Sequence, residues 1–318
     1  MPAISASAPG KIILFGEHAV VYSRPAIAVP VLQVKAKTTI VADPLAPPHS
    51  VLIDAPVIGL SSSLKDLDPD HPIRFVIQQV MQALDIVELP SVRIRLTSTI
   101  PLAAGLGSSS ASSVSLARAL STFLGHPLSD ESINRIAFES EKIHHGHPSG
   151  IDNTVTTYAR PIFFIKNQPI EWLEVGLPMI FVISDTGQSS HTVSVVADVR
   201  RNWTAAPEKY EAWFDDIGQY AFQAKQAVKT GQLDEIGRLM TRNHELLQEL
   251  DVSSPELDQL VETAICAGAL GAKLSGGGRG GNSIALAQSI DQAQVIAESL
   301  KSAGAVSTLI TTVPMSER

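Results

Sequence analysis

Residues 101–114 read Pro-Leu-Ala-Ala-Gly-Leu-Gly-Ser-Ser-Ser-Ala-Ser-Ser-Val, a small-residue loop with two glycines that runs into three consecutive serines. Apolar residues recur at steps of three and four from Ala111 to Leu124, which predicts a helix with one buried face, and Gly125 ends it. A glycine-rich turn leading into a helix presents unpaired backbone N–H groups and the positive end of the helix dipole to one point. Such a point suits a phosphate. The same residues also fit a serine-capped core helix after a flexible turn, so the stretch alone does not decide between the two.

The composition is that of an ordinary globular protein, with 44% hydrophobic and 18% charged residues. A length of 318 residues favours two domains. The net charge of −8, without a Lys/Arg cluster, argues against a nucleic-acid-binding surface. Because no apolar run approaches ~18 residues and no secretory signal is visible, we expect a cytoplasmic protein without a membrane partner. The single cysteine, Cys266, lies in an apolar helical pattern and predicts an inert core thiol.

The N-terminal half alternates predicted strands and helices. Strands are expected at residues 4–8, 12–15 and 92–98, two joined strands at 26–41, a loop at 43–72, and helices at 73–84 and from Ser129 onward. Lys11 stands just before the second strand, and Glu17 and His18 stand just after it. Charged residues in such places are usually solvated strand ends.

Two acidic residues near the middle of the chain are candidates for chemistry. Glu141 falls at the margin of the apolar stripe of the helix that begins at Ser129, where a carboxylate needs a cation such as a metal or a lysine. Asp152 follows a Pro-Ser-Gly turn, where it can serve acid–base chemistry or simply cap its own backbone. The three histidines within residues 144–147 do not predict a zinc site, because adjacent histidines diverge and no cysteine is near.

The C-terminal half contains a second glycine-rich loop, Lys273-Leu274-Ser275-Gly276-Gly277-Gly278-Arg279-Gly280-Gly281-Asn282. Five glycines within six residues are too many for a plain hairpin tip and allow backbone to approach a ligand closely. Around this loop the pattern predicts strands at 162–165, 179–184, 283–287 and 306–312, and helices at 208–229, 233–250, from Pro255 and at 291–302.

Three ordered motifs, at residues 9–22, 101–113 and 273–281, resemble those of the GHMP kinase superfamily over essentially the whole chain, and the first motif is most similar to the mevalonate kinases. The resemblance implies an α+β fold of two domains, at about 1–170 and 171–318, with the active site in the cleft between them. The N-terminal domain would be ribosomal protein S5 domain 2-like with a left-handed β-α-β crossover, and the C-terminal domain would be ferredoxin-like.

The implied reaction is transfer of a phosphoryl group from ATP, with Mg²⁺, to the 5-hydroxyl of mevalonate. Other members of the superfamily, acting on phosphomevalonate or a sugar, and an inactive ligand sensor on the same fold are the alternatives. The sequence leaves open whether the chain forms a homodimer.

The resemblance assigns a role to each motif residue. Residues that would cradle the ATP phosphates are Pro101, Gly105, Leu106, Gly107, Ser108, Ser109 and Ser110 on one side and Gly276, Gly277 and Gly278 on the other. Ser109 and Glu141 match the magnesium ligands, a hydroxyl and a carboxylate that suit this hard cation. Asp152 matches the catalytic base, and Lys11 matches the lysine that holds it and stabilises charge at the attacking oxygen. Glu17 and His18 would lie on the substrate side.

One segment departs from the family pattern. Mevalonate kinases place an arginine or lysine beside a threonine after the strand expected at 179–184, whereas residues 188–194 here contain neither, and Arg200 is the next cation. We therefore expect His191 and Thr192, with the hydroxyls of residues 189–190, to face the mevalonate carboxylate. The alternative is that this run caps a helix, while His18 or a distant lysine holds the carboxylate.

Overall fold

The computed structural model describes residues 3–101, 105–145, 148–190 and 192–316. The chain forms two compact units, the first made of residues 1–10, 32–101 and 107–159 and the second of residues 11–31, 102–106 and 160–318. Strands β1 (Ile4–Phe15) and β2 (Ala26–Ala42) contribute to both units. The domain boundary expected near residue 170 stays a prediction.

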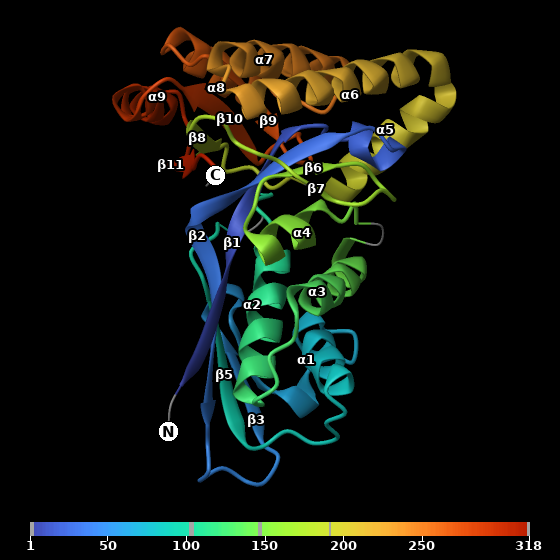
Figure 1. Cartoon of the computed structure of the whole chain (residues 1–318), viewed down its shortest axis with the longest axis vertical. Coiled ribbons are helices and arrows are strands. Elements are labelled where there is room, and N and C mark those ends of the chain that lie inside the picture. Colours follow the sequence, from blue (N-terminus) through green and yellow to red (C-terminus); the bar gives the residue numbers. More distant parts are fainter. Residues whose placement is uncertain (1–2, 102–104, 146–147, 191, 317–318) are drawn as a thin grey trace. The chain divides into compact units, whose positions relative to one another are not determined.

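In the first unit, helices cover one face of a sheet (Figure 1). The strands follow the order β4-β3-β5-β2, with β1 paired to β2, and the further strands are β3 (Val51–Ala55), β4 (Leu60–Ser63) and β5 (Val92–Ser98). The helices are α1 (Pro72–Ala83), α2 (Ser108–Phe123), α3 (Asp130–His145) and α4 (Ile151–Tyr158). Short 3₁₀ turns lie at Pro56–Ile58 and Leu64–Asp66. Strands β3 and β5 are parallel and connect through α1, which gives a β-α-β unit.

Several strand expectations in this part of the chain are wrong. The two strands expected at 4–8 and 12–15 form the single strand β1, whose pairing with β2 alone lets Pro9 lie in it without breaking an inner ladder. The break expected near Pro30 is also absent from β2, because Pro30 lies between the stretch that pairs with β6 and the stretch that pairs with β5. The loop expected at 43–72 contains β3 and β4, since Val51–Ala55 pairs with both β4 and β5.

Helix α2 lies at the centre of the first unit. It begins at Ser108, as the sequence predicts, and packs against α1, α3, α4 and β5. It is buried on more than the one expected face, because its serines are small enough to let neighbouring elements approach. The Oγ atoms of Thr38 and Ser115 lie 2.9 Å apart, and those of Ser113 and Ser140 lie 3.1 Å apart, so β2 and α3 are tied to α2 by buried hydroxyl pairs.

The second unit contains an antiparallel sheet in the order β11-β8-β10-β9. Its strands are β8 (Met179–Asp185), β9 (Gly271–Ser275), β10 (Asn282–Ala287) and β11 (Ser307–Val313). The chain runs β8, helices, β9, β10, helix, β11, which is the β-α-β-β-α-β connectivity of a ferredoxin-like fold. Strand β6 (Ile162–Phe164) pairs with the beginning of β2 and with β7 (Glu171–Trp172).

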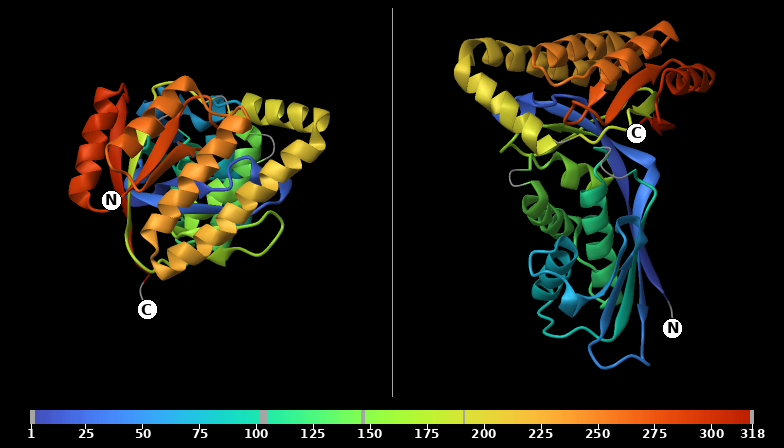
Figure 2. Two further views of the ribbon diagram at one scale, coloured as in Figure 1. Left: turned by 90° about the horizontal axis from the view of Figure 1, so that it is seen from above. Right: turned by 180° about the vertical axis from the view of Figure 1, so that it is seen from behind.

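The described part of the second unit contains five helices, of which the last three pack on this sheet (Figure 2). They are α5 (Thr192–Ala205), α6 (Pro207–Thr230), α7 (Leu233–Glu249), α8 (Pro255–Cys266) and α9 (Ile290–Ser302), with a 3₁₀ turn at Ala19–Tyr22. One apolar cluster joins α8 and α9 to the sheet, and another joins α5, α6, α7 and the 3₁₀ turn. Cys266 ends α8 and is exposed, so the expected core thiol is wrong. No helix in the described ranges is long and apolar enough to cross a membrane.

Candidate active-site residues

The serines of the second motif lie at the beginning of α2. Gly107 is the N-cap, with φ 75°, a left-handed conformation that glycine adopts without cost. Ser108 and Ser109 are half-buried, and the buried Oγ of Ser110 has no hydrogen-bond partner among the described residues. The first turn of this 16-residue helix therefore supplies free backbone N–H groups and hydroxyls at one point. Pro101 is half-buried before it.

Both acidic candidates lie on helices that pack against α2. Glu141, on α3, is only 4% exposed and follows Ser140, whose hydroxyl pairs with Ser113 of α2. Asp152 is half-buried in the first turn of α4, after the N-cap Gly150. Helices α2, α3 and α4 contact one another. The first unit thus gathers the serines, the proposed metal carboxylate and the proposed base.

Residues 11–22 of the first motif belong to the second unit, and its charged residues are more buried than the sequence suggests. Lys11 lies inside β1 instead of before a strand and is 4% exposed, and its backbone N–H donates to Leu106 O at 2.9 Å. Gly16 turns the chain with φ 97°, where a Cβ would lie 2.5 Å from the Cα of Ala26. Glu17 and His18, after this turn, are both buried, so none of the three charged residues is a solvated strand end.

Glu17 forms a fully buried ion pair with Lys273 of β9. Lys273 Nζ also donates to Leu274 O at 2.6 Å. Burial raises the pKa of Glu17 and lowers the pKa of Lys273, and the charge of each partner opposes the shift of the other. The sequence assigned no role to Lys273. The signal that could have found it is a lysine within an apolar strand, directly before a glycine-rich loop.

The glycine loop at 276–281 lies against His18 and the segment before α5. His18 Nε2 donates to Gly277 O at 3.1 Å. Ser190 Oγ donates to Gly278 O at 2.9 Å. A Cβ on Gly277 would lie 2.5 Å from Thr192 Oγ1, so this close approach requires glycine. The structure therefore brings Thr192 and His18 to the loop.

Burial lowers the pKa of His18 to about 4. At neutral pH His18 is therefore a hydrogen-bond donor without a positive charge.

The exposure of the remaining candidates differs. His191 lies outside the described residues, Thr192 and Arg200 are exposed, and Gly276 is half-buried. Gly105 is exposed and Leu106 is buried.

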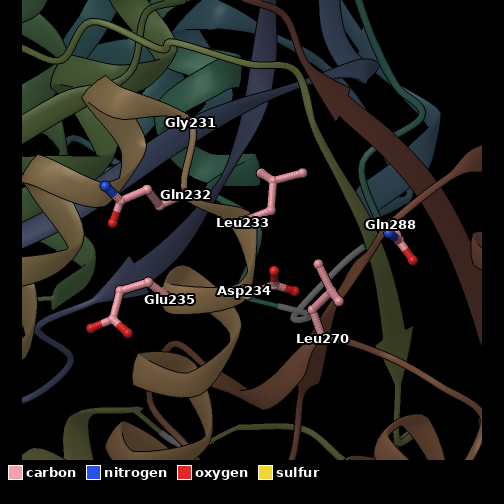
Figure 3. Close-up of a pocket in the computed structure, with 7 residues that line it drawn as sticks. All are labelled: Gly231, Gln232, Leu233, Asp234, Glu235, Leu270 and Gln288. Carbon is pink, nitrogen blue, oxygen red and sulfur yellow. The ribbon is translucent and has the colours of Figure 1, made fainter.

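A surface pocket of about 500 Å³ lies elsewhere in the second unit, at the beginning of α7 (Figure 3). Its lining residues are Gly231, Gln232, Leu233, Asp234, Glu235, Leu270 and Gln288. None of the motif residues lines it. Two carboxylates at its rim make it unsuited to an anionic ligand such as a nucleotide.

Residues 72–160 match the model of the GHMP kinases N terminal domain, and residues 224–306 match that of the GHMP kinases C terminal domain. A mevalonate kinase of Thermococcus onnurineus is 38% identical over 89% of this chain and 89% of its own length. One of Pyrococcus horikoshii is 33% identical over 95% of this chain and 93% of its own. The crystal structure of L. major mevalonate kinase in complex with R-mevalonate has a TM-score of 0.87 and 30% identity, covering 99% of this chain and 97% of that one.

Proposed function

The chain belongs to the GHMP kinase family, and to the mevalonate kinases within it, and from this premise we propose how its residues carry out the reaction. The reaction transfers the terminal phosphoryl group of ATP to the 5-hydroxyl of mevalonate and yields 5-phosphomevalonate and ADP. The residue assignment is based mainly on one observation. Ser108–Ser110, Glu141 and Asp152 lie on three helices, α2, α3 and α4, that contact one another. Phosphoryl transfer requires mainly positioning and neutralisation of charge, which such a grouping can supply.

The first turn of α2 binds the phosphates of ATP in this proposal. Its backbone N–H groups have no partners within the helix, and the helix dipole favours a negative group there. Gly107 brings the backbone into this position, and the hydroxyls of Ser108 and Ser109 add donors. The loop at 276–281, whose glycines allow close approach, contacts the phosphates as the second binding segment.

Mg²⁺ fits the residues present. Glu141 is a buried carboxylate, and a buried carboxylate requires a positive partner or donors. The buried Oγ of Ser110 has no hydrogen-bond partner among the described residues, so the beginning of α2 offers a second hydroxyl oxygen beside that of Ser109. Glu141 and Ser109 would hold the ion, since Mg²⁺ is commonly bound through one or two carboxylates together with phosphate oxygens. When bound, it would neutralise charge on the phosphates.

Asp152 acts as the base that accepts the proton of the 5-hydroxyl, and Lys11 stabilises the negative charge that develops on that oxygen. Asp152 is half-buried in the first turn of α4, so the helix backbone positions it without removing it fully from the surface. Lys11 is buried in β1, where loss of solvent strengthens its interaction with a nearby negative charge. Glu17, His18, His191 and Thr192 lie on the substrate side.

A coupled assay of ADP release tests the function. The purified protein is supplied with ATP, Mg²⁺ and either mevalonate, phosphomevalonate or galactose. We expect turnover with mevalonate and none above background with the other two. Turnover with phosphomevalonate or galactose instead would make the chain a different GHMP kinase, and no turnover with any of them would favour a ligand sensor.

A further inference from the structure

Arg279 is the single side chain in a loop of glycines. Every other residue from 276 to 281 is glycine, so within the loop Arg279 is the residue whose own side chain can contact the rest of the protein. Its φ is 52°, a left-handed conformation in which an L-residue is strained and glycine is not. An arginine at this position therefore carries a local backbone cost, which its side-chain contacts can offset.

The guanidinium of Arg279 points to two helices and away from the loop. Nη1 lies 2.6 Å from Asp198 Oδ2 of α5, and Nη2 lies 2.8 Å from Asp251 Oδ2, just past the end of α7. Nε donates to Asp251 O and the backbone N–H donates to Val252 O, both at 2.9 Å. Its charge is matched by two carboxylates, so Arg279 holds the loop and does not serve as a phosphate ligand.

These contacts attach α5 to the loop at two points. At its first residue, Thr192 lies so close to Gly277 that no larger residue fits there. Six residues later, Asp198 pairs with Arg279, and its side chain is 27% exposed, whereas that of Asp251 is 78% exposed. The two points are separated by roughly 9 Å of helix. Together they fix both the position and the direction of α5 relative to the loop.

We propose that Arg279 is a positioning residue that, through Asp198, holds the glycine loop and α5 in one arrangement, so that the phosphate-binding backbone and Thr192 are placed together. This inference rests on the proposed function, because that function puts ATP at the loop and mevalonate at Thr192. Loss of the Arg279–Asp198 pair would then weaken the binding of both substrates.

The chain offers a matched set of variants. Arg279→Gly removes both ion pairs and also relieves the left-handed strain, so we expect its thermal midpoint to stay within about 3 °C of wild type. Asp198→Asn removes the same pair from the helix side. Arg279→Lys keeps the charge but lacks the planar fork that reaches two carboxylates. Arg201→Ala is the control, because Arg201 belongs to α5, like Asp198, and pairs with the other oxygen of the same carboxylate, with Nη1 2.9 Å from Asp198 Oδ1.

Steady-state kinetics and amide hydrogen exchange of the free protein are the readouts. We expect Arg279→Gly and Asp198→Asn each to raise KM for both ATP and mevalonate at least about threefold, with kcat affected less and no further rise in the double variant. Arg279→Lys should be intermediate. Amide hydrogen exchange should be faster at residues 192–199 and 276–281 in Arg279→Gly and in Asp198→Asn. In Arg201→Ala the exchange rates at these residues should equal those of wild type.

Either of two results overturns the proposal. One is an unchanged KM for mevalonate in both Arg279→Gly and Asp198→Asn. The other is a rise in KM without faster exchange at 192–199, which would make Arg279 a determinant of the loop alone. Failure of the proposed function is separate, since it would appear as wild-type protein that does not phosphorylate mevalonate. In that case the exchange comparison still decides whether Arg279 joins the loop to α5.

Discussion

At the scale of single residues, burial decides which charges remain available for chemistry. His18 is neutral at pH 7 because its pKa is about 4, and the ammonium of Lys273 is paired with the carboxylate of Glu17. Neither supplies a free positive charge for a substrate carboxylate. Among the described residues assigned to the substrate side, Thr192 offers a hydroxyl to that carboxylate, while His191 lies outside the described residues.

Asp152→Asn tests the assignment of the base. The amide keeps the size of the carboxylate but cannot accept the proton, so kcat should fall by about 10²-fold or more. ATP affinity, measured by equilibrium binding, should remain within twofold, because the proposed function places the phosphates at α2 and not at Asp152. Asp130→Asn is the control, since Asp130 also lies in a helix first turn but pairs with Arg118. Near-normal turnover of Asp152→Asn would remove Asp152 from the mechanism.

Lys273→Met tests the buried ion pair. Removing the ammonium leaves the carboxylate of Glu17 buried without its partner, which should lower the free energy of unfolding by about 3–5 kcal/mol. Urea denaturation measures it. Adding Glu17→Met should recover much of the loss, because the remaining buried charge is then gone. A single variant as stable as wild type, or a double variant no better than the single, would contradict this account.

At the scale of elements, three packed helices set the donors around the proposed metal. Helix α2 provides hydroxyls at its first turn, α3 presents Glu141 toward its buried side, and α4 begins with the turn that holds Asp152. The hydroxyl pair of Ser113 and Ser140 fixes α3 on α2 one residue before Glu141. The spacing of these groups therefore depends on helix packing.

Magnesium dependence tests this arrangement. Glu141→Gln and Ser109→Ala should each raise the Mg²⁺ concentration needed for half-maximal rate, since each would remove one of the two oxygen ligands proposed for the ion. Glu139→Gln is the matched control, because Glu139 lies on the same helix, two residues away, but its side chain is 41% exposed and pairs with Lys142. If the control and the two variants give the same magnesium titration, other residues hold the metal.

At the scale of the whole molecule, buried histidines couple stability to pH. Burial lowers the pKa of both His18 and His244 to about 4. His244 Nδ1 accepts a hydrogen bond from the backbone N–H of Leu274 at 3.4 Å, and Nε2 lies 3.2 Å from Asp258 Oδ1, which fits the neutral ring. Between pH 6.5 and 4, the unfolded chain therefore binds protons that the folded chain does not.

Stability should consequently fall as the pH falls below about 6.5, by at most ~3 kcal/mol for each histidine. The raised pKa of Glu17 acts in the opposite direction, because the folded chain then binds a proton that the unfolded chain does not, so the contribution of a histidine is read from a variant that lacks it. Urea denaturation at several pH values measures it. His244→Asn, which keeps an acceptor for Leu274, should show a shallower slope. An equal slope in wild type and variant would mean that His244 does not contribute.

The sequence by itself determined the local features of this protein. Glycine and serine spacing placed the beginning of α2, Ser254 placed the cap of α8, and the three motifs identified the family. These features depend on residues a few positions apart, whose propensities and caps act within one turn or strand.

Tertiary structure decided what depends on distant partners. Lys273 and Glu17 are 256 positions apart, and Arg279 is 81 positions from Asp198, so no local pattern could pair them. The same holds for the continuity of β1 through Pro9, which follows from its pairing with β2 alone. The sequence predicts Lys11 as a solvated strand end because it flanks the apolar run 12–15, whereas in the folded chain Lys11 lies within the longer strand β1 and is buried.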